Sequence, residues 1–573
     1  MCYKEDMRKV KESLTLPIIT DVAEALETFA NEDELGLDTE TSGLSYIADE
    51  VAVVSLYGIK SARAAILHVQ GVMPPALIEF LSSKREFIFH NGGAFDALFL
   101  ARYGVDLDTP IWFDTIIAEA ICLKSARKDL RVSLQATIRR RLGIDLLKEA
   151  GGHTWMRGRL TPEQLKYCQE DVMYLKKVKT AQLKDMGPEQ LRALALEHKL
   201  MPILVKMSLR GLPIDYTRVG EYNRQVLKDQ EDAAAFLQNL WGEVNLASPS
   251  QIVAAVHTHC GYTLTSTTAE SMQAMAAAPG QAGEVARAIT LRKDAGRGLL
   301  GTALEYQSFD GVLYPRYRQV NRDDGRIEIV EPDLTKIPAE ARSLFGGVTD
   351  HMVVSVRYLN LWWGIMAYLS RDPGMQEIVG MYLPTAMAEK MWPHMATLLS
   401  GMPYENQKSC RALARGALFG HPSAKLAQHL QALGVLEVDA GALNHEFLTA
   451  FPNLRRLHKQ AEVQALLPAV PITFPTGMRR VVAKAQPWEI TSLRAKGAAG
   501  AVIKGTLLIL QETGLANNLR AIVGEELVFV VPSGIGMEEH WSNRIKQVMA
   551  DASTKVLGFP LCADIRVGLY WSI

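Results

Sequence analysis

The chain has 573 residues, 48% hydrophobic and 22% charged, with a formal net charge of −1. This is the composition of an ordinary soluble globular protein, and at roughly 100–200 residues per domain the length predicts three or four domains. Near-neutral charge does not exclude a nucleic-acid partner, because the Lys and Arg clusters that bind nucleic acid are local.

The six cysteines are scattered without a C-x-x-C pair. This spacing argues against a zinc site or a disulfide framework and favours a reducing compartment. No segment offers about 18 consecutive apolar residues, and no apolar run follows the charged N-terminus. We therefore expect an intracellular protein with neither a signal peptide nor a membrane partner.

Residues 35–43 (LGLDTETSG) alternate apolar and polar side chains before a Ser-Gly turn, which predicts the end of a half-buried strand. Asp38 and Glu40 are two residues apart, so they point to one face of that strand. Neighbouring carboxylates repel unless a cation lies between them, and hard oxygen ligands suit magnesium or manganese. A solvated strand edge is the alternative interpretation of this pair alone.

Further strands are predicted at residues 51–57 and 64–69, which are rich in apolar and β-branched side chains. A fourth strand, starting at Glu86, ends at His90-Asn91 before a Gly-Gly turn. Asp96 then lies early in an amphipathic helix, where the N-terminal end of the helix dipole is an alternative reason for an acid.

A helix is predicted to open at Phe113-Asp114-Thr115. The basic run at residues 126–141 fits either a solvated helix face or a phosphate contact. Residues 165–175 predict a helix in which Tyr167 and Asp171 share a face. Such a Tyr-Asp pair is also a common structural motif, so it is ambiguous by itself.

Taken together, Asp38-x-Glu40, Asn91-x4-Asp96 and Tyr167-x3-Asp171 resemble the three motifs of the DEDD 3′–5′ exonucleases, in the subgroup with a tyrosine in the third motif. The resemblance covers roughly residues 17–190. It implies a ribonuclease H-like mixed sheet flanked by helices. It also implies a site for two divalent ions, Mg²⁺ or Mn²⁺.

The resemblance implies a role for each matching residue. In phosphodiester hydrolysis two metal ions stabilise charge on the attacking water and on the leaving 3′-oxygen, and four carboxylates neutralise the ions. The implied ligands, direct or through water, are Asp38, Glu40, Asp96 and Asp171. Tyr167 would orient the attacking water, and Thr41 and Asn91 would contact the 3′-terminal nucleotide.

From Pro188 the pattern changes to long amphipathic helices. Residues 200–215 predict a helix that ends in a glycine turn, and Ser248-Pro249 marks another helix start. Residues 287–297 carry four basic side chains beside the single acid Asp294. This stretch fits either a plain helical domain or a basic arm along a duplex.

Residues 211–215, 245–251 and especially 325–338 (GRIEIVEPDLTKIP) look like the thumb and palm entry of family A DNA polymerases. Thr335 departs from the usual glutamine. The similarity implies a grip on primer-template DNA, with Arg326 among the contacts, and it continues to the C-terminus. The implied domains are an exonuclease at 1–190, a thumb at 191–310, and palm and fingers at 311–573, with the fingers at about 375–470.

The palm motifs of that family are altered here. Arg357 stands where the family has a metal-binding aspartate, and Trp362 replaces a glutamate. A guanidinium is not deprotonated in proteins and cannot ligate a cation. Residues 524–526 (Gly524, Glu525 and Glu526) stand against the family's His-Asp-Glu. Glu525 could still bind metal, but its extra methylene displaces the carboxylate.

The fingers helix keeps two cations and a ring at four-residue intervals, which places them on one face. These residues are Arg411, Arg415, where the family usually has lysine, and Phe419. The remaining departures from the family are Ser423-Ala424 for Tyr-Gly, Tyr382 for a histidine before Thr385-Ala386, and Gly500 and Lys504 at template-contact positions. By resemblance, Lys504 and the fingers residues bind substrate.

Our leading hypothesis is a metal-dependent 3′–5′ DNA exonuclease on a family A polymerase scaffold whose palm no longer polymerises. The first alternative is a DNA polymerase with proofreading and an atypical palm site. The second is a non-catalytic DNA-binding replication accessory protein. The expected partners are DNA 3′ ends and a replication protein, in the cytoplasm of a bacterium or a phage-infected cell.

Overall fold

The computed structural model describes residues 18–123, 132–146, 155–276, 278, 280–293, 304, 308–381, 386, 390–392, 407–432 and 439–572. Contacts divide the chain into two compact units. Unit 1 comprises Met1–Arg210, Arg316–Val330 and Pro471–Val481. Unit 2 comprises Gly211–Pro315, Glu331–Val470 and Val482–Ile573.

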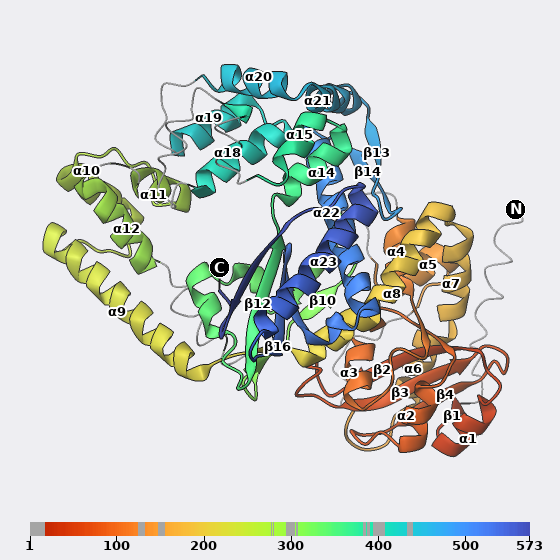
Figure 1. Cartoon of the computed structure of the whole chain (residues 1–573). Coiled ribbons are helices and arrows are strands. Elements are labelled where there is room, and N and C mark those ends of the chain that lie inside the picture. Colours follow the sequence, from red (N-terminus) through yellow and green to blue (C-terminus); the bar gives the residue numbers. More distant parts are fainter. Residues whose placement is uncertain are drawn as a thin grey trace, which may run out of the picture. The chain divides into compact units, whose positions relative to one another are not determined.

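Unit 1 is built on a six-stranded mixed sheet, whose strands are red and orange in Figure 1. The order is β1 (Ile18–Ile19), β4 (Ala64–His68), β3 (Val51–Gly58), β2 (Glu34–Thr41), β5 (Glu86–Phe89) and β6 (Ile111–Asp114). β3 runs antiparallel to both β2 and β4, whereas the other pairs are parallel. The strands expected from β-branched runs are therefore present, and β3 is almost wholly buried, as its apolar sequence requires.

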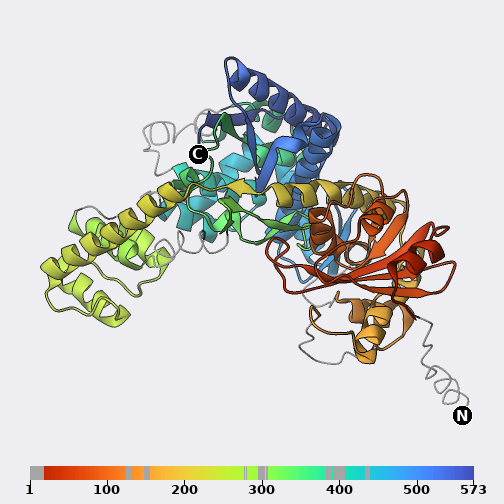
Figure 2. The same cartoon turned by 90° about the horizontal axis from the view of Figure 1, so that it is seen from below.

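Helices pack against this sheet, and Figure 2 gives a second view of them. They are α1 (Val22–Thr28), α2 (Pro75–Leu81), α3 (Asp96–Arg102), α4 (Thr115–Cys122), α5 (Leu134–Leu142), α6 (Pro162–Met173), α7 (Leu175–Lys184) and α8 (Pro188–Arg210), with the short 3-10 helix η2 (Gly92–Ala94). Thr161 and Gln164 form a reciprocal capping box that starts α6. The helix expected from residue 200 begins earlier, at Pro188, and continues through Pro202.

Two later segments also belong to unit 1. One carries β10 (Arg316–Arg318), which pairs with β11 (Glu328–Glu331). The other lies in the hairpin of β13 (Ala469–Thr473) and β14 (Arg479–Ala483). Unit 1 is therefore discontinuous in sequence.

Unit 2 contains a four-stranded antiparallel sheet, the palm sheet. Its order is β15 (Leu519–Val523), β16 (Glu526–Pro532), β12 (His351–Tyr358) and β17 (Ala563–Gly568). The register places Arg357 of β12 directly opposite Glu526 on one side and Asp564 on the other. Residues opposite one another share a face of the sheet, so these three form a row.

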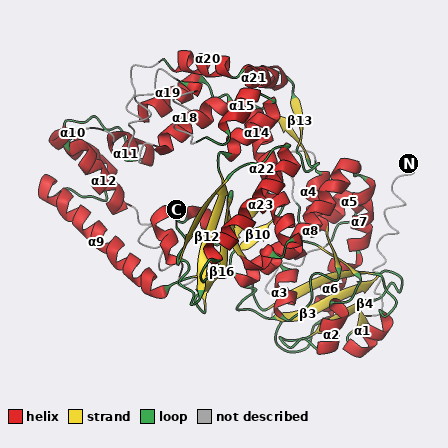
Figure 3. Ribbon diagram, viewed as in Figure 1, coloured by secondary structure: helices red, strands yellow, loops and turns green. Residues whose placement is uncertain are grey.

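The rest of unit 2 is mostly helical, as the red ribbons of Figure 3 show. The helices are α9 (Tyr216–Trp241), α10 (Pro249–Cys260), α11 (Ala269–Ala276), α12 (Gln281–Lys293), α14 (Leu361–Ser370), α15 (Pro373–Ile378), α18 (Gln407–Phe419), α19 (Ser423–Ala432), α20 (Ala440–Ala450), α21 (Pro452–Ala465), α22 (Pro487–Glu512) and α23 (Met537–Leu557). A small sheet joins β7 (Leu212–Pro213), β9 (Val312–Leu313) and β8 (Ser308–Phe309). Among the described helices, none is long and apolar enough to cross a bilayer.

Candidate nuclease and palm sites

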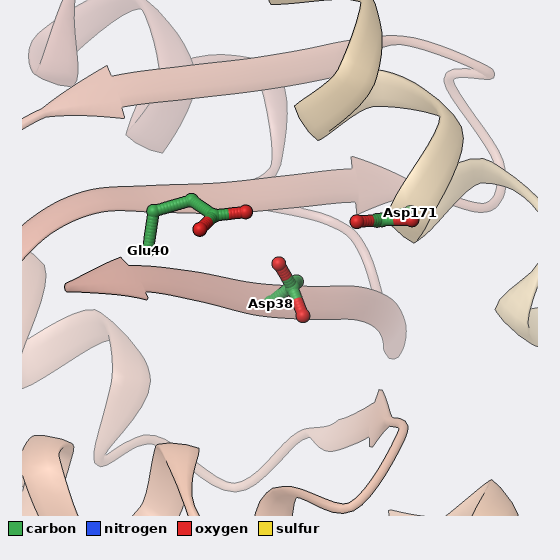
Figure 4. A group of neighbouring side chains, drawn as sticks. All are labelled: Asp38, Glu40 and Asp171. Carbon is green, nitrogen blue, oxygen red and sulfur yellow. The ribbon is translucent and has the colours of Figure 1, made fainter. Parts of the chain in front are cut away.

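Three carboxylates meet where α6 packs against β2 in unit 1. Asp38 and Glu40 come from β2, and Asp171 comes from α6. One ligand atom of each lies within 4.8 Å of the others, and all three residues are partly exposed. Figure 4 shows their carboxylates directed into a common space. Within the described part of the chain, no other group of three or more His, Cys, Asp or Glu residues meets this distance criterion.

A glycine allows the helix and the strand to approach closely enough for this arrangement. A Cβ added at Gly36 of β2 would lie 2.6 Å from the carbonyl oxygen of Val172, the residue after Asp171. That distance is below any real contact, so a side chain at Gly36 would push α6 away from the strand. The close approach brings Asp171 to the face that carries Asp38 and Glu40.

Asp96 lies outside the group of three and holds the strand between its two acids. Its Oδ1 accepts hydrogen bonds from the Thr39 backbone N–H at 2.8 Å and from the Thr39 hydroxyl at 2.7 Å. Asp96 is 3% exposed, and burial raises the pKa of its carboxyl to about 6, although the Thr39 bonds oppose that shift. Its role as a metal ligand stays a prediction.

Tyr167 lies beside the three carboxylates. Burial and the negative charges of Asp171 and Glu40 raise the pKa of its phenol above the ordinary value, so the hydroxyl keeps its proton at neutral pH. The ring of Trp155 lies 6.0 Å from the Tyr167 ring, centroid to centroid. A protonated phenol at this position can donate a hydrogen bond to a water or a phosphate oxygen.

Thr41 and Asn91, the two residues expected to contact the nucleotide, are partly exposed. Asn91 is hydrogen-bonded to a buried acid. The Thr41 hydroxyl donates to the Gly43 carbonyl at 2.6 Å. Asn91 has a left-handed backbone, with φ +69°, and donates its N–H to Asp114 at 2.9 Å. Asp114 is 1% exposed, and burial raises its pKa to about 6. Sequence reasoning treated Asp114 only as a helix start, which it also is, because it caps α4.

The donor set of the acidic group fits a hard divalent cation. All three donors are carboxylate oxygens, the ligands that Mg²⁺ and Mn²⁺ prefer, and no sulfur or imidazole contributes. The group is therefore compatible with a divalent cation.

In the palm sheet, Arg357 and its two neighbours Asp564 and Glu526 take part in ion pairs. Asp564 Oδ2 accepts hydrogen bonds from Arg357 Nε at 2.9 Å and contacts Arg357 Nη2 at 2.8 Å. Glu526 contacts Arg342 Nη1 at 2.6 Å and accepts a hydrogen bond from the Trp571 indole at 2.7 Å. The acids of this row are therefore each held by a side chain of this chain.

Trp362 packs against the aromatic residue of the fingers helix. Its ring lies edge-on to Phe419 with 5.7 Å between centroids, and Phe419 is only 5% exposed. A glutamate, which the resemblance implies for position 362 in the family, could not make this ring contact with Phe419. Phe419 is thus buried within the chain, with Trp362 as one of its neighbours.

The other residues predicted to contact substrate differ in exposure to solvent. Lys504 is 1% exposed within α22, so a template contact would require it to become accessible. Arg326 is paired with Asp324 through Nε at 3.1 Å, and Arg415 is exposed. The Arg411 side chain, Tyr382 and Thr385 lie outside the described residues. Glu525 is partly exposed beside Gly524 at the β15–β16 turn, where Gly524 has φ +65°.

The basic run of the first third has a structural role that neither interpretation anticipated. Arg140 Nη1 and Arg141 Nε contact the two carboxylate oxygens of Glu119 at 2.6 and 2.7 Å. Glu119 is fully buried. Both arginines therefore contact a buried acid, while Arg140 itself stays exposed to solvent, as a solvated helix face would require. Residues 126–131 lie outside the described part.

The chain thus combines an acidic cluster on a mixed sheet with an antiparallel palm sheet and long helices, as the resemblance to an exonuclease joined to a polymerase led us to expect. A family model for a 3′–5′ exonuclease matches residues 17–186, and the model for DNA polymerase family A matches residues 217–573. The chain belongs to DNA polymerase family A. The recognised family and the fold class predicted from sequence are thus confirmed.

The chain is similar in sequence to bacterial DNA polymerases I. DNA polymerase I of Aquifex aeolicus is 21% identical over 95% of both chains. DNA polymerase I of Rhizobium leguminosarum is 23% identical over 66% of this chain, which spans only 40% of that relative's length. The solved POL domain of Pol1 from M. smegmatis, in complex with DNA primer-template and dNTP, has a TM-score of 0.76 at 17% identity and covers 97% of this chain and 99% of its own. At that identity the likeness establishes the fold.

Proposed function

We propose that the chain is a metal-dependent 3′–5′ exodeoxyribonuclease whose palm does not perform nucleotidyl transfer. The proposal rests on the difference between the acidic group of unit 1 and the palm sheet of unit 2. Asp38, Glu40 and Asp171 converge in unit 1. In the palm sheet, the guanidinium of Arg357 contacts Asp564 instead.

In the nuclease site, Asp38, Glu40 and Asp171 would hold Mg²⁺ or Mn²⁺, with Asp96 acting directly or through water. Two bound ions supply electrostatic stabilisation of the attacking and leaving oxygens. The protonated Tyr167 phenol would orient the attacking water by hydrogen bonding. Thr41 and Asn91 would fix the 3′-terminal nucleotide.

The palm would act as a platform for DNA. The guanidinium of Arg357 repels a metal ion and neutralises Asp564, and Trp362 packs against the ring of Phe419. The proposed DNA contacts outside the nuclease site are Arg326, Arg411, Arg415, Phe419 and Lys504. The bacterial polymerases among the relatives are consistent with a DNA 3′ end as substrate, a replication protein as partner, and a bacterial cytoplasm.

A second candidate is a proofreading DNA polymerase with an atypical palm. Two observations favour it. Glu525 is partly exposed at the β15–β16 turn, at the position of a family metal ligand. The solved neighbour is itself a polymerase domain with primer-template and dNTP.

The test uses a recessed primer-template labelled at the primer 5′ end, with Mg²⁺ or Mn²⁺. Shortening of the primer without nucleotides, abolished in Asp38→Ala/Glu40→Ala, supports the nuclease. Matched controls are Asp33→Ala and Glu24→Ala, which remove exposed acids from the same unit. If primer length never changes, the nuclease proposal fails and a non-catalytic DNA-binding role takes its place.

A further inference from the structure

Two helices hold the turn before Asp96. Asp114 Oδ1 accepts the Asn91 N–H at 2.9 Å, and Oδ2 accepts the Gly93 N–H at 3.1 Å. α8 also approaches the turn so closely that a Cβ at Gly93 would lie 2.8 Å from Met201 Cγ. The position of this turn is therefore set by α4, which Asp114 caps, and by α8.

The far end of α4 is held by a residue from late in the chain. Arg480 of β14 is 2% exposed, and its Nη1 donates to the carbonyls of Ala120 at 2.9 Å and Leu123 at 3.3 Å. These carbonyls lie at the C-terminus of α4, where backbone acceptors lack helical partners and the helix dipole favours a cation. A buried guanidinium thus fixes the end of the helix opposite Asp114.

The other late segment of unit 1, Arg316–Val330, holds α8 next to the same turn. Gln319 Nε2 donates to the backbone carbonyl of Glu197 at 2.7 Å and to its carboxylate at 2.9 Å. The next residue, His198, accepts the backbone N–H of Asp114 at 3.2 Å. β10, which precedes Gln319, itself lies beside η2. Both late segments thus converge on the helices that hold the turn.

We propose that Arg480 and Gln319 are positioning residues of the nuclease, which fix the Asn91–Gly93 turn and Asp96 through α4 and α8. The inference rests on the proposed exonuclease function. It makes the nuclease site dependent on two segments that follow it by more than a hundred residues in the sequence. Residues 1–190 alone would lack both supports.

The experiment compares Arg480→Met and Gln319→Met in the full chain. Lys60→Met is the control, because Lys60 is an exposed cation of the same unit and pairs with the exposed Asp33, away from α4 and α8. Hydrogen exchange of the Asn91 and Gly93 amides reports the turn directly, and Val54 in β3 reports the fold of the unit. Exonuclease kcat and KM report the consequence, and Arg480→Lys tests rescue, since an ammonium can still donate to carbonyls.

We expect the Asn91 and Gly93 amides to exchange about tenfold faster in both variants, with Val54 unchanged. kcat should fall about tenfold, and Arg480→Lys should recover part of it. Unchanged exchange at both amides in the folded variants overturns the inference, even if activity falls. If Arg480→Met does not fold, Gln319→Met decides. If the unaltered protein lacks nuclease activity, the proposed function fails, and the exchange data still test the positioning role.

Discussion

Arg357 and Asp564 face each other across adjacent strands of the palm sheet, and one carboxylate oxygen contacts two guanidinium nitrogens at 2.8 and 2.9 Å. Glu526 lies opposite Arg357 on the other neighbouring strand. The middle of this acid–base–acid row is the position where family A carries a metal-binding aspartate, as the resemblance implies. We propose that the Arg357 guanidinium therefore takes the place of a bound metal ion.

Replacing that cation with an acid should make the palm depend on metal. In the background Asp38→Ala/Glu40→Ala, the pair of changes Arg357→Asp and Glu525→Asp places like charges beside Glu526 and Asp564. We expect a loss of about 1 kcal/mol in the free energy of unfolding without metal, because like charges on opposite residues repel. Mn²⁺ should restore it, as measured by thermal unfolding with and without the ion.

The control for this experiment is Arg357→Met, which removes the charge without adding an acid. It should lose stability but gain nothing from Mn²⁺. If Mn²⁺ stabilises the Asp38→Ala/Glu40→Ala protein equally with and without the two palm substitutions, the added acids create no metal site, which contradicts the role given to Arg357.

The nuclease carboxylates should couple metal binding to stability. A ligand that binds only the folded state at 100 times its Kd stabilises it by about 2.7 kcal/mol. We therefore expect Mn²⁺ to raise the Tm of the unaltered protein, and expect Asp38→Ala/Glu40→Ala to lose most of that rise. Differential scanning calorimetry in EDTA and in Mn²⁺ measures both. An equal rise in both proteins would place the ions elsewhere.

His198 should make stability depend on pH. Burial lowers its pKa to about 4, below the ordinary 6.5, and its Nε2 accepts the Asp114 N–H only when neutral. A lowered folded-state pKa means that this contribution is complete above pH 6.5 and is lost as pH falls toward 4. By pH 5 the loss is about 2 kcal/mol.

His198→Gln keeps an acceptor but does not titrate. Urea unfolding at pH 7.5 and pH 5 should therefore show the unaltered protein losing about 2 kcal/mol more than the variant between the two values. A stability difference that is the same at both pH values would remove His198 as the titrating group.

Glu119 should be one of the costliest single substitutions in unit 1. It is fully buried between Arg140 and Arg141, and Gln182 Nε2 also donates to it at 2.9 Å. Glu119→Gln removes the charge but leaves two guanidinium groups facing a neutral amide, which should cost about 3 kcal/mol. Chemical denaturation measures it, with Asp145→Asn, the exposed partner of Arg139, as control. A cost below about 1 kcal/mol would mean that water compensates both arginines.

Local pattern predicted the elements better than their partners. The alternation around Asp38 and Glu40 predicted one shared face, and the spacing of Tyr167 and Asp171 predicted another, because both follow from the period of a strand or a helix. The close approach that joins the two faces depends on Gly36 against Val172, a tertiary contact without a local signal.

The missed features are all partners distant in sequence. Nothing near Arg140 indicates that Glu119 lies on a neighbouring helix, and nothing near Arg357 indicates Asp564, 207 residues later. The support of Arg480 for α4 is likewise invisible to periodicity, because a buried arginine in a strand follows no hydrophobic pattern. A glutamate in a hydrophobic helix, such as Glu119 in TIIAEAIC, was the one available signal of a buried ion pair.

We propose that nucleotidyl transfer is lost in this chain while the nuclease chemistry remains. The most direct measurement uses Asp38→Ala/Glu40→Ala, in which no nuclease can mask extension, with a recessed primer-template, all four deoxynucleotides and Mg²⁺ or Mn²⁺. We expect the primer to keep its length with this variant and to be shortened by the unaltered protein without nucleotides. Primer extension by the variant would contradict it.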